Sequence, residues 1–164
     1  MALRQDARSP PADMMRTGTL DIMPDRFEAL AETRPAAAQV LLVEDHRLVR
    51  HVMARALRAA GYGVWEAENA GQALLPERVD AAVIDVSLPG GMNGLEFGRI
   101  ARRRWAGMPI VFVTGLMDFE LPEPVPQDRT TRLLHKPFGA REIVALVNAL
   151  LTARFGRGDV PAAE

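Results

Sequence analysis

Three carboxylates and the only lysine of this 164-residue sequence stand at the ends of short apolar runs. They are Glu44, Asp45, Asp85 and Lys136. Every other member of the set of 20 lysines and arginines is an arginine. An ammonium is a compact charge that can follow a small anion, whereas a guanidinium is a planar fork that favours a fixed bidentate partner. The pattern indicates a site at which the lysine and the carboxylates handle a small anion.

Carboxylates that lie close together repel one another, and a bound divalent cation would neutralise their negative charge. Mg²⁺ takes oxygen ligands, commonly one or two carboxylates together with water and a phosphate oxygen. With such an ion bound, Asp85 would act as a nucleophile toward a phosphoryl group and form an acyl phosphate. The ion and Lys136 would supply the charge neutralisation that this transfer needs. Thr114, at the end of another apolar run, would donate its hydroxyl to the phosphoryl oxygens.

Five short apolar runs alternate with longer helical patterns from Gln39 onward. The runs are Val40–Val43, Gly63–Trp65, Ala81–Ile84, Ile110–Val113 and Thr131–Leu134. Strands that alternate with helices are typical of an α/β domain with a doubly wound sheet. Functional groups in such sheets gather beyond the carboxyl ends of the parallel strands. The sequence therefore predicts a five-stranded parallel sheet with the acidic residues and the lysine at one edge.

Two of the helical patterns are amphipathic. The first ends at Gly61, and its predicted apolar face comprises Leu48, Val52, Met53, Ala56, Leu57 and Ala60. The last ends near Gly156, and its predicted apolar face comprises Ile143, Val147, Leu150 and Leu151. These stripes have the width of ordinary core-facing helices.

Three prolines interrupt the segment before the fifth run, where the alternation calls for a fourth helix. They are Pro122, Pro124 and Pro126. Each removes a backbone donor and pushes the preceding residue away from helical angles. We therefore predict an irregular or broken fourth helix, with a short turn followed by an extended or mobile segment.

Composition excludes several classes of protein. A net charge of -1 gives no electrostatic argument for a nucleic-acid or membrane partner. The absence of cysteine excludes disulfides and thiolate metal sites. No stretch approaches the roughly 18 apolar residues of a membrane span. We expect a cytoplasmic protein with an N-terminal extension at 1–38, partly disordered or with a short helix at 25–33, a domain at 39–155 and a tail at 156–164.

The motifs, taken in order, resemble those of receiver domains of two-component response regulators. They are Glu44-Asp45, Asp85 within Val-Ile-Asp-Val-Ser-Leu-Pro-Gly-Gly-Met-Asn-Gly-Leu-Glu, Thr114-Gly115 and Lys136-Pro137-Phe138. The resemblance implies a flavodoxin-like fold, with Asp85 as phosphoacceptor, Thr114 as switch hydroxyl and Lys136 paired with the phosphoryl group. It also implies a cis bond before Pro137. The implied ligands of Mg²⁺ are Glu44, Asp45, Asp85 and the backbone carbonyl of Ser87.

Two further features depart from the pattern of most relatives. Gly90-Gly91 adds a residue to the loop after Asp85, which predicts a different local geometry. Leu133 stands where many relatives have a Tyr or Phe that moves with the switch hydroxyl. We therefore expect no aromatic switch in this chain.

Only nine residues follow Phe155, so we expect a stand-alone response regulator rather than an enzyme. It would accept the phosphoryl group from a sensor histidine kinase or a histidine phosphotransfer protein and dock on a downstream protein. The predicted docking surface is the proline-containing segment, the fifth strand and the last helix, with a homodimer left open. A phosphorylation-independent interaction module is the alternative. An aspartyl phosphatase ranks last, because Ser87 stands where such enzymes usually place a second carboxylate.

Overall fold

The computed structural model describes residues 37–156. The short helical pattern at 25–33, most of the predicted extension and nearly all of the predicted tail lie outside the described residues. Within 37–156, no helix is long and apolar enough to cross a membrane.

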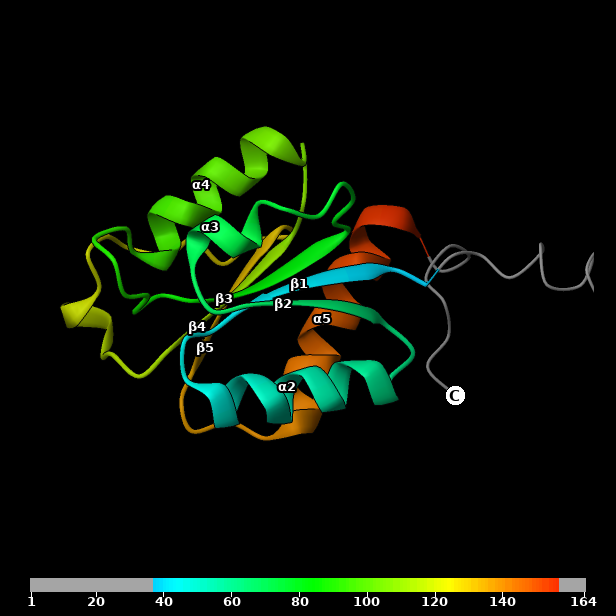
Figure 1. The fold of residues 1–164 in the computed structure, drawn as a ribbon, viewed down its shortest axis with the longest axis horizontal. Coiled ribbons are helices and arrows are strands. Elements are labelled where there is room, and N and C mark those ends of the chain that lie inside the picture. Colours follow the sequence, from blue (N-terminus) through cyan, green and yellow to red (C-terminus); the bar gives the residue numbers. More distant parts are fainter. Residues whose placement is uncertain (1–36, 157–164) are drawn as a thin grey trace, which may run out of the picture. The chain divides into compact units, whose positions relative to one another are not determined.

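Five strands and four α-helices alternate along the described chain (Figure 1). In order, the elements are β1 (Gln39–Val43), α2 (Arg47–Ala59), β2 (Gly63–Ala67), α3 (Ala70–Ala73), β3 (Ala81–Asp85), α4 (Gly94–Arg104), β4 (Ile110–Thr114), the 3₁₀ helix η1 (Asp118–Glu120), β5 (Thr131–His135) and α5 (Ala140–Phe155). The strands form one parallel sheet in the order β2-β1-β3-β4-β5. This arrangement confirms the predicted doubly wound, flavodoxin-like sheet.

Alternation along the strands divides the core into two layers. In β1, Val40 and Leu42 pack in the cluster that contains α2 and α5 side chains, whereas Leu41 and Val43 pack in the cluster of α3 and α4. Figure 1 shows the two pairs of helices on opposite faces of the sheet. β3 and β4 are buried along their whole length, as expected when helices cover both faces. The sheet is therefore a fixed platform for the loops at its carboxyl edge.

The buried face of α2 is rotated relative to the predicted face. Met53 and Leu57 are buried as predicted, but Leu48 and Val52 are 70% and 57% exposed. The inward stripe continues instead through Val49, which packs against the core. Neighbouring residues of a helix point about 100° apart, so a stripe that includes residue 49 turns residue 48 toward solvent.

The connection from β4 to β5 contains no α-helix, as the prolines predict. After η1 the backbone is irregular from Leu121 to Thr130. Leu121 and Val125 nevertheless pack against the core on the α4 side of the sheet. Arg99 of α4 forms an ion pair with Glu123. Side-chain contacts thus hold this segment in place, although its backbone forms neither a helix nor a strand.

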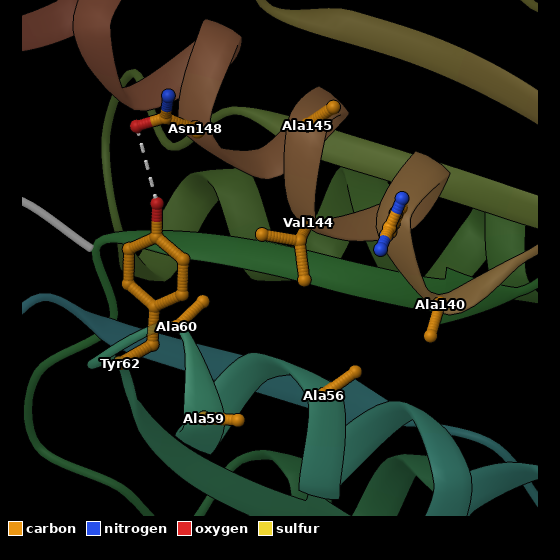
Figure 2. Close-up of a pocket in the computed structure, with 9 residues that line it drawn as sticks. Ala56, Ala59, Ala60, Tyr62, Ala140, Val144, Ala145 and Asn148 are labelled. Carbon is orange, nitrogen blue, oxygen red and sulfur yellow. Dashed lines mark hydrogen bonds between the residues drawn. The ribbon is translucent and has the colours of Figure 1, made fainter. Parts of the chain in front are cut away.

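A groove of about 530 Å³ lies between α2 and α5. Figure 2 shows walls made mostly of small side chains, among them Ala56, Ala59, Ala60, Ala140 and Ala145. Across it, the Tyr62 hydroxyl donates to Asn148 Oδ1 at 3.3 Å. None of the lining residues is acidic, so the groove is separate from the acidic edge of the sheet.

Candidate functional site

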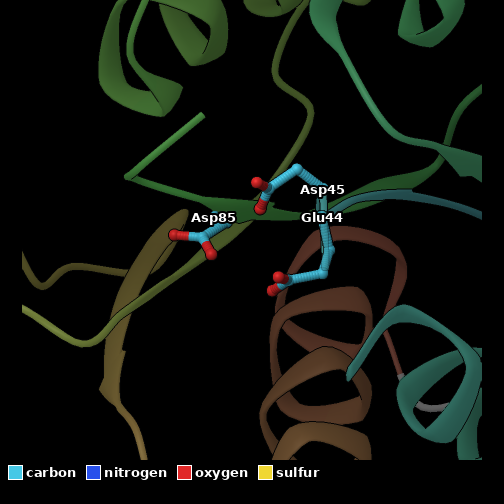
Figure 3. Close-up of side chains that lie close together, drawn as sticks. All are labelled: Glu44, Asp45 and Asp85. Carbon is cyan, nitrogen blue, oxygen red and sulfur yellow. The ribbon is translucent and has the colours of Figure 1, made fainter. Parts of the chain in front are cut away.

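The acidic residues meet where β1 and β3 end. These strands are parallel neighbours with Val43 opposite Ile84, so the residues that follow them lie side by side. Glu44, Asp45 and Asp85 each place a carboxylate oxygen within 4.8 Å of the others. Figure 3 shows the three side chains at this edge. Glu44 and Asp85 are buried and Asp45 is exposed, so the cluster is open to solvent on the Asp45 side.

Lys136 brings a positive charge into this cluster from the end of β5. Its Nζ lies 2.8 Å from Glu44 Oε2 and 2.6 Å from Asp85 Oδ2. Its backbone N–H donates to the carbonyl of Thr114 at 2.7 Å, which ties the ends of β4 and β5 together. The bond before Pro137 is cis, as the family resemblance predicts. The structure thus brings together the lysine and the carboxylates that the sequence placed at one edge.

Burial and charge act in opposite directions on this ion pair. Burial raises the pKa of Glu44, and the charge of Asp85 adds to the rise, while the hydrogen bond from Lys136 opposes it. Burial acts to lower the pKa of Lys136, but its hydrogen bonds to Asp85 and Glu44 outweigh burial and raise this pKa above its ordinary value. The lysine is therefore charged at neutral pH.

Both carboxylate oxygens of Asp85 have partners. Oδ1 accepts a hydrogen bond from the backbone N–H of Ser87 at 2.8 Å, and Oδ2 accepts one from Lys136. Ser87 is the second residue of the loop after β3, and its main chain lies beside the carboxylate. These bonds fix the orientation of the Asp85 side chain.

Thr114 closes β4 at the same edge and is fully buried. Its Oγ1 accepts a hydrogen bond from the backbone N–H of Leu116 at 3.0 Å. Within residues 37–156 the hydroxyl makes no hydrogen bond to Asp85. The hydroxyl is therefore engaged in its own loop rather than in the acidic cluster.

Residues 40–148 match the family model of the response regulator receiver domain. This chain belongs to the response regulator receiver family. The match runs from β1 into α5 and includes every residue of the acidic edge. Receiver domains are typically non-enzymatic signalling modules that interact with histidine kinases or phosphotransfer proteins.

Relatives of this receiver domain include proteins much longer than the match. It is 32% identical to the alkaline phosphatase synthesis transcriptional regulatory protein SphR of Synechococcus elongatus, over 81% of this chain and 57% of SphR. It is 34% identical to the sensor kinase CckA of Brucella abortus, over 70% of this chain and 13% of CckA. It is 30% identical to the response regulator receiver protein CpdR of Brucella abortus, over 70% of this chain and 98% of CpdR. The chain thus spans little more than half of SphR but nearly all of CpdR.

Solved receiver structures share the fold. A response regulator receiver protein from Sinorhizobium medicae aligns with a TM-score of 0.63 and 26% identity, covering 72% of this chain and 97% of its own. The receiver domain of the hybrid histidine kinase CckA aligns with a TM-score of 0.58 and 30% identity, covering 70% of this chain and 99% of its own. Both likenesses agree with the fold described above.

The donor set of this receiver domain suits Mg²⁺. Receiver domains bind this ion at an acidic pocket, and the corresponding cluster here offers carboxylate oxygens that lie within 4.8 Å of one another. Hard divalent ions prefer oxygen ligands of this kind. The partly open position of Asp45 leaves room for water beside these oxygens.

The loop after β3 contains the paired glycines for which the sequence predicted a different local geometry. Gly90 and Gly91 have φ angles of +99° and +86°, in the left-handed region that side chains disfavour. The two glycines therefore form a local turn, and the chain returns so that the Gly94 N–H donates to Val86 O at 2.8 Å.

Sequence reasoning missed the residues that fix the backbone beside Asp85. A Cβ on Gly94 would lie 2.0 Å from the Asp85 carbonyl oxygen, so α4 can begin here only with a glycine. Asn93 caps this helix, because its Oδ1 accepts from the Glu96 N–H at 2.9 Å and its own N–H donates to Glu96 Oε2 at 3.1 Å. The Asn-x-x-Glu spacing resembles the known capping signal and is readable in the sequence.

His135 ties the loop after β4 to the end of β5. Its Nδ1 lies 3.0 Å from the Leu116 carbonyl oxygen, and its Nε2 lies 3.0 Å from Asp118 Oδ1. Leu133, for which the sequence predicted no aromatic switch, packs partly buried against the core. The loop that holds the Thr114 hydroxyl is therefore linked to β5 by histidine.

Proposed function

We propose that this receiver domain is a stand-alone response regulator. Asp85 accepts a phosphoryl group from a sensor histidine kinase or a histidine phosphotransfer protein, and the phosphorylated form docks on a downstream protein. The observation that carries the proposal is the bridge from Lys136 to Asp85 and Glu44, at 2.6 and 2.8 Å. The match over 98% of CpdR supports a receiver that acts as a protein of its own. In this proposal the receiver comprises residues 39–155, with an extension at 1–38 and a tail at 156–164.

The transfer to Asp85 forms an acyl phosphate. A carboxylate oxygen of Asp85 attacks phosphorus, the bond from phosphorus to the donor's imidazole nitrogen breaks, and the released imidazole takes up a proton. The Ser87 N–H orients the carboxylate through Oδ1. The flexible stem of Lys136 lets its ammonium move from Oδ2 to the incoming phosphoryl oxygens. Such a reaction depends mainly on alignment and charge neutralisation.

The proposed ligands of Mg²⁺ are Glu44, Asp45, Asp85 and the backbone carbonyl of Ser87. When bound, the ion neutralises negative charge on the phosphoryl oxygens. Lys136 keeps the buried Glu44 carboxylate in place. The exposed side of the cluster at Asp45 gives the phosphodonor access to Asp85.

Thr114 is the proposed switch hydroxyl. When it turns toward the phosphoryl group, it gives up its hydrogen bond from Leu116, whose carbonyl oxygen lies beside His135. The loop at 115–120 and the proline-containing segment would then change their arrangement. We propose that this segment, β5 and α5 form the docking surface on which a downstream protein reads the phosphorylated state.

Intact mass spectrometry after incubation with acetyl phosphate and Mg²⁺ tests this function. We expect one added phosphoryl group in the wild-type chain and none in Asp85→Asn or in a magnesium-free sample. Glu77→Gln, at an exposed carboxylate outside both the cluster and the loop at 115–120, is the control and should be modified normally. Modification that persists in Asp85→Asn would contradict the assignment of the phosphoacceptor.

A phosphorylation-independent interaction module is the competing hypothesis. Leu133 and the irregular segment before β5 are compatible with it. The buried pair of Glu44 and Asp85 argues against it, because buried charges are costly to retain in a module that does not use them. No mass adduct, together with an amide NMR spectrum that beryllium fluoride leaves unchanged, would favour this module.

A further inference from the structure

Arg50 of α2 contacts the backbone of the acidic pair rather than its carboxylates. Its Nη1 donates to the carbonyl oxygen of Glu44 at 2.6 Å and lies 3.2 Å from that of Asp45. The side chain is only 14% exposed. Because a guanidinium holds its N–H donors in a rigid plane, one such group can fix two carbonyl oxygens in a defined geometry.

The remaining nitrogens of Arg50 face the end of β2. Nε lies 3.8 Å from Glu66 Oε2, and Nη2 lies 3.6 Å from Glu68 Oε2. The backbone N–H of Glu44 also donates to Ala67 O at 3.1 Å. Arg50 therefore joins the loop after β1 both to its own helix and to the neighbouring strand.

Asp45 depends on this link more than the other carboxylates. Glu44 and Asp85 accept hydrogen bonds from Lys136 and from nearby backbone N–H groups. In the described part of the chain, the Asp45 carboxylate accepts none. Its direction is set by the backbone at residue 45, and Arg50 contacts the carbonyl groups on both sides of that Cα.

We propose that Arg50 is a positioning residue for Mg²⁺ binding, which holds the backbone of Glu44 and Asp45 so that the Asp45 carboxylate faces Asp85. The proposal rests on the proposed function, which makes this cluster a magnesium site. Groups that orient metal ligands commonly change metal affinity by about 10- to 100-fold when they are removed. We expect Arg50→Ala to weaken Mg²⁺ binding by about tenfold or more.

A simple effect of charge would have the opposite sign. Removing a cation from the neighbourhood of the site reduces the repulsion on Mg²⁺, so the charge effect alone would strengthen binding in Arg50→Ala. The direction of the change therefore separates a role in geometry from a role in electrostatics.

Arg58 provides the matched control on the same helix. It pairs with Glu66 Oε1 at 2.8 Å and donates to the Val64 carbonyl at 3.1 Å, but it makes no contact with the acidic pair. Isothermal titration of MgCl₂ into the wild-type chain, Arg50→Ala and Arg58→Ala measures affinity without any phosphodonor. Urea unfolding of the same proteins measures stability. We expect weaker Mg²⁺ binding in Arg50→Ala only.

The outcomes separate the two proposals. If the wild-type chain binds no Mg²⁺, the proposed function fails and the role of Arg50 fails with it. If the wild-type chain binds Mg²⁺ but Arg50→Ala binds equally or more tightly, or Arg58→Ala loses as much, only the role of Arg50 is overturned. Arg50→Lys keeps the charge but lacks the planar fork, and it serves as the test variant if Arg50→Ala does not fold. It should also bind Mg²⁺ more weakly than the wild type, and unchanged binding would overturn the proposal.

Discussion

Replacing Lys136 with methionine would leave two buried carboxylates facing each other without their cation. Methionine keeps an unbranched apolar stem and removes the charge. The side chains of Glu44 and Asp85 are 0% and 5% exposed, and that of Lys136 is 27% exposed. Removing one partner of a buried ion pair costs about 3–5 kcal/mol. Because the lysine side chain is partly exposed, we expect the lower end, about 3 kcal/mol of unfolding free energy near neutral pH.

Urea unfolding of the wild type and Lys136→Met, with and without Mg²⁺, measures this cost. Mg²⁺ should restore more stability to the variant than to the wild type, because it replaces the missing cation and meets no competing ammonium. Adding Glu44→Gln to the variant removes one of the two repelling carboxylates and should recover part of the loss. Equal stabilities without Mg²⁺, or a deficit that Mg²⁺ does not reduce, would refute the reasoning.

The remaining predictions concern pH and the backbone beside the site. Because the pKa of Glu44 is raised, this residue favours folding below the ordinary value of 4.5, and its contribution is lost as pH rises through the raised pKa. Glu44→Gln should therefore reduce the dependence of the melting temperature on pH in this range. An unchanged pH dependence would argue against the raised pKa. Gly94→Ala should cost about 1–3 kcal/mol and slow phosphorylation, because its Cβ would lie 2.0 Å from the Asp85 carbonyl oxygen. Gly115→Ala, where a Cβ meets nothing within 4 Å, should change the melting temperature less. Asn93→Ala should cost about 1 kcal/mol in urea unfolding through the lost helix cap, and no loss would show that the cap is not needed.

The strands and the acidic edge were predictable because of a simple geometric rule. The residues that follow the strands of a parallel sheet lie at one edge of that sheet, so the sequence alone places Glu44, Asp85 and Lys136 together. Prolines act locally on the backbone, and the absence of an α-helix at 121–130 followed from them alone.

Other features depend on packing that sequence spacing does not specify. Both Leu48 and Val49 fit an apolar helical stripe, and only the docking of α2 on the sheet decides that Val49 faces inward. The contacts of Arg50 with two carbonyl oxygens could not be predicted either, because every residue type carries a backbone carbonyl. Gly94 is explained only by the approach of the Asp85 backbone in space.

The bridge made by Lys136 also gives the molecule a built-in spectroscopic reporter. Because it is the only lysine of the 164-residue sequence, growth on isotopically labelled lysine would give a single side-chain signal, free of overlap. Its Nζ contacts both Glu44 and Asp85, so that one resonance senses any change at either carboxylate. Metal titration, phosphoryl transfer and partner docking could all be followed in the unmodified wild-type protein, without introducing a probe.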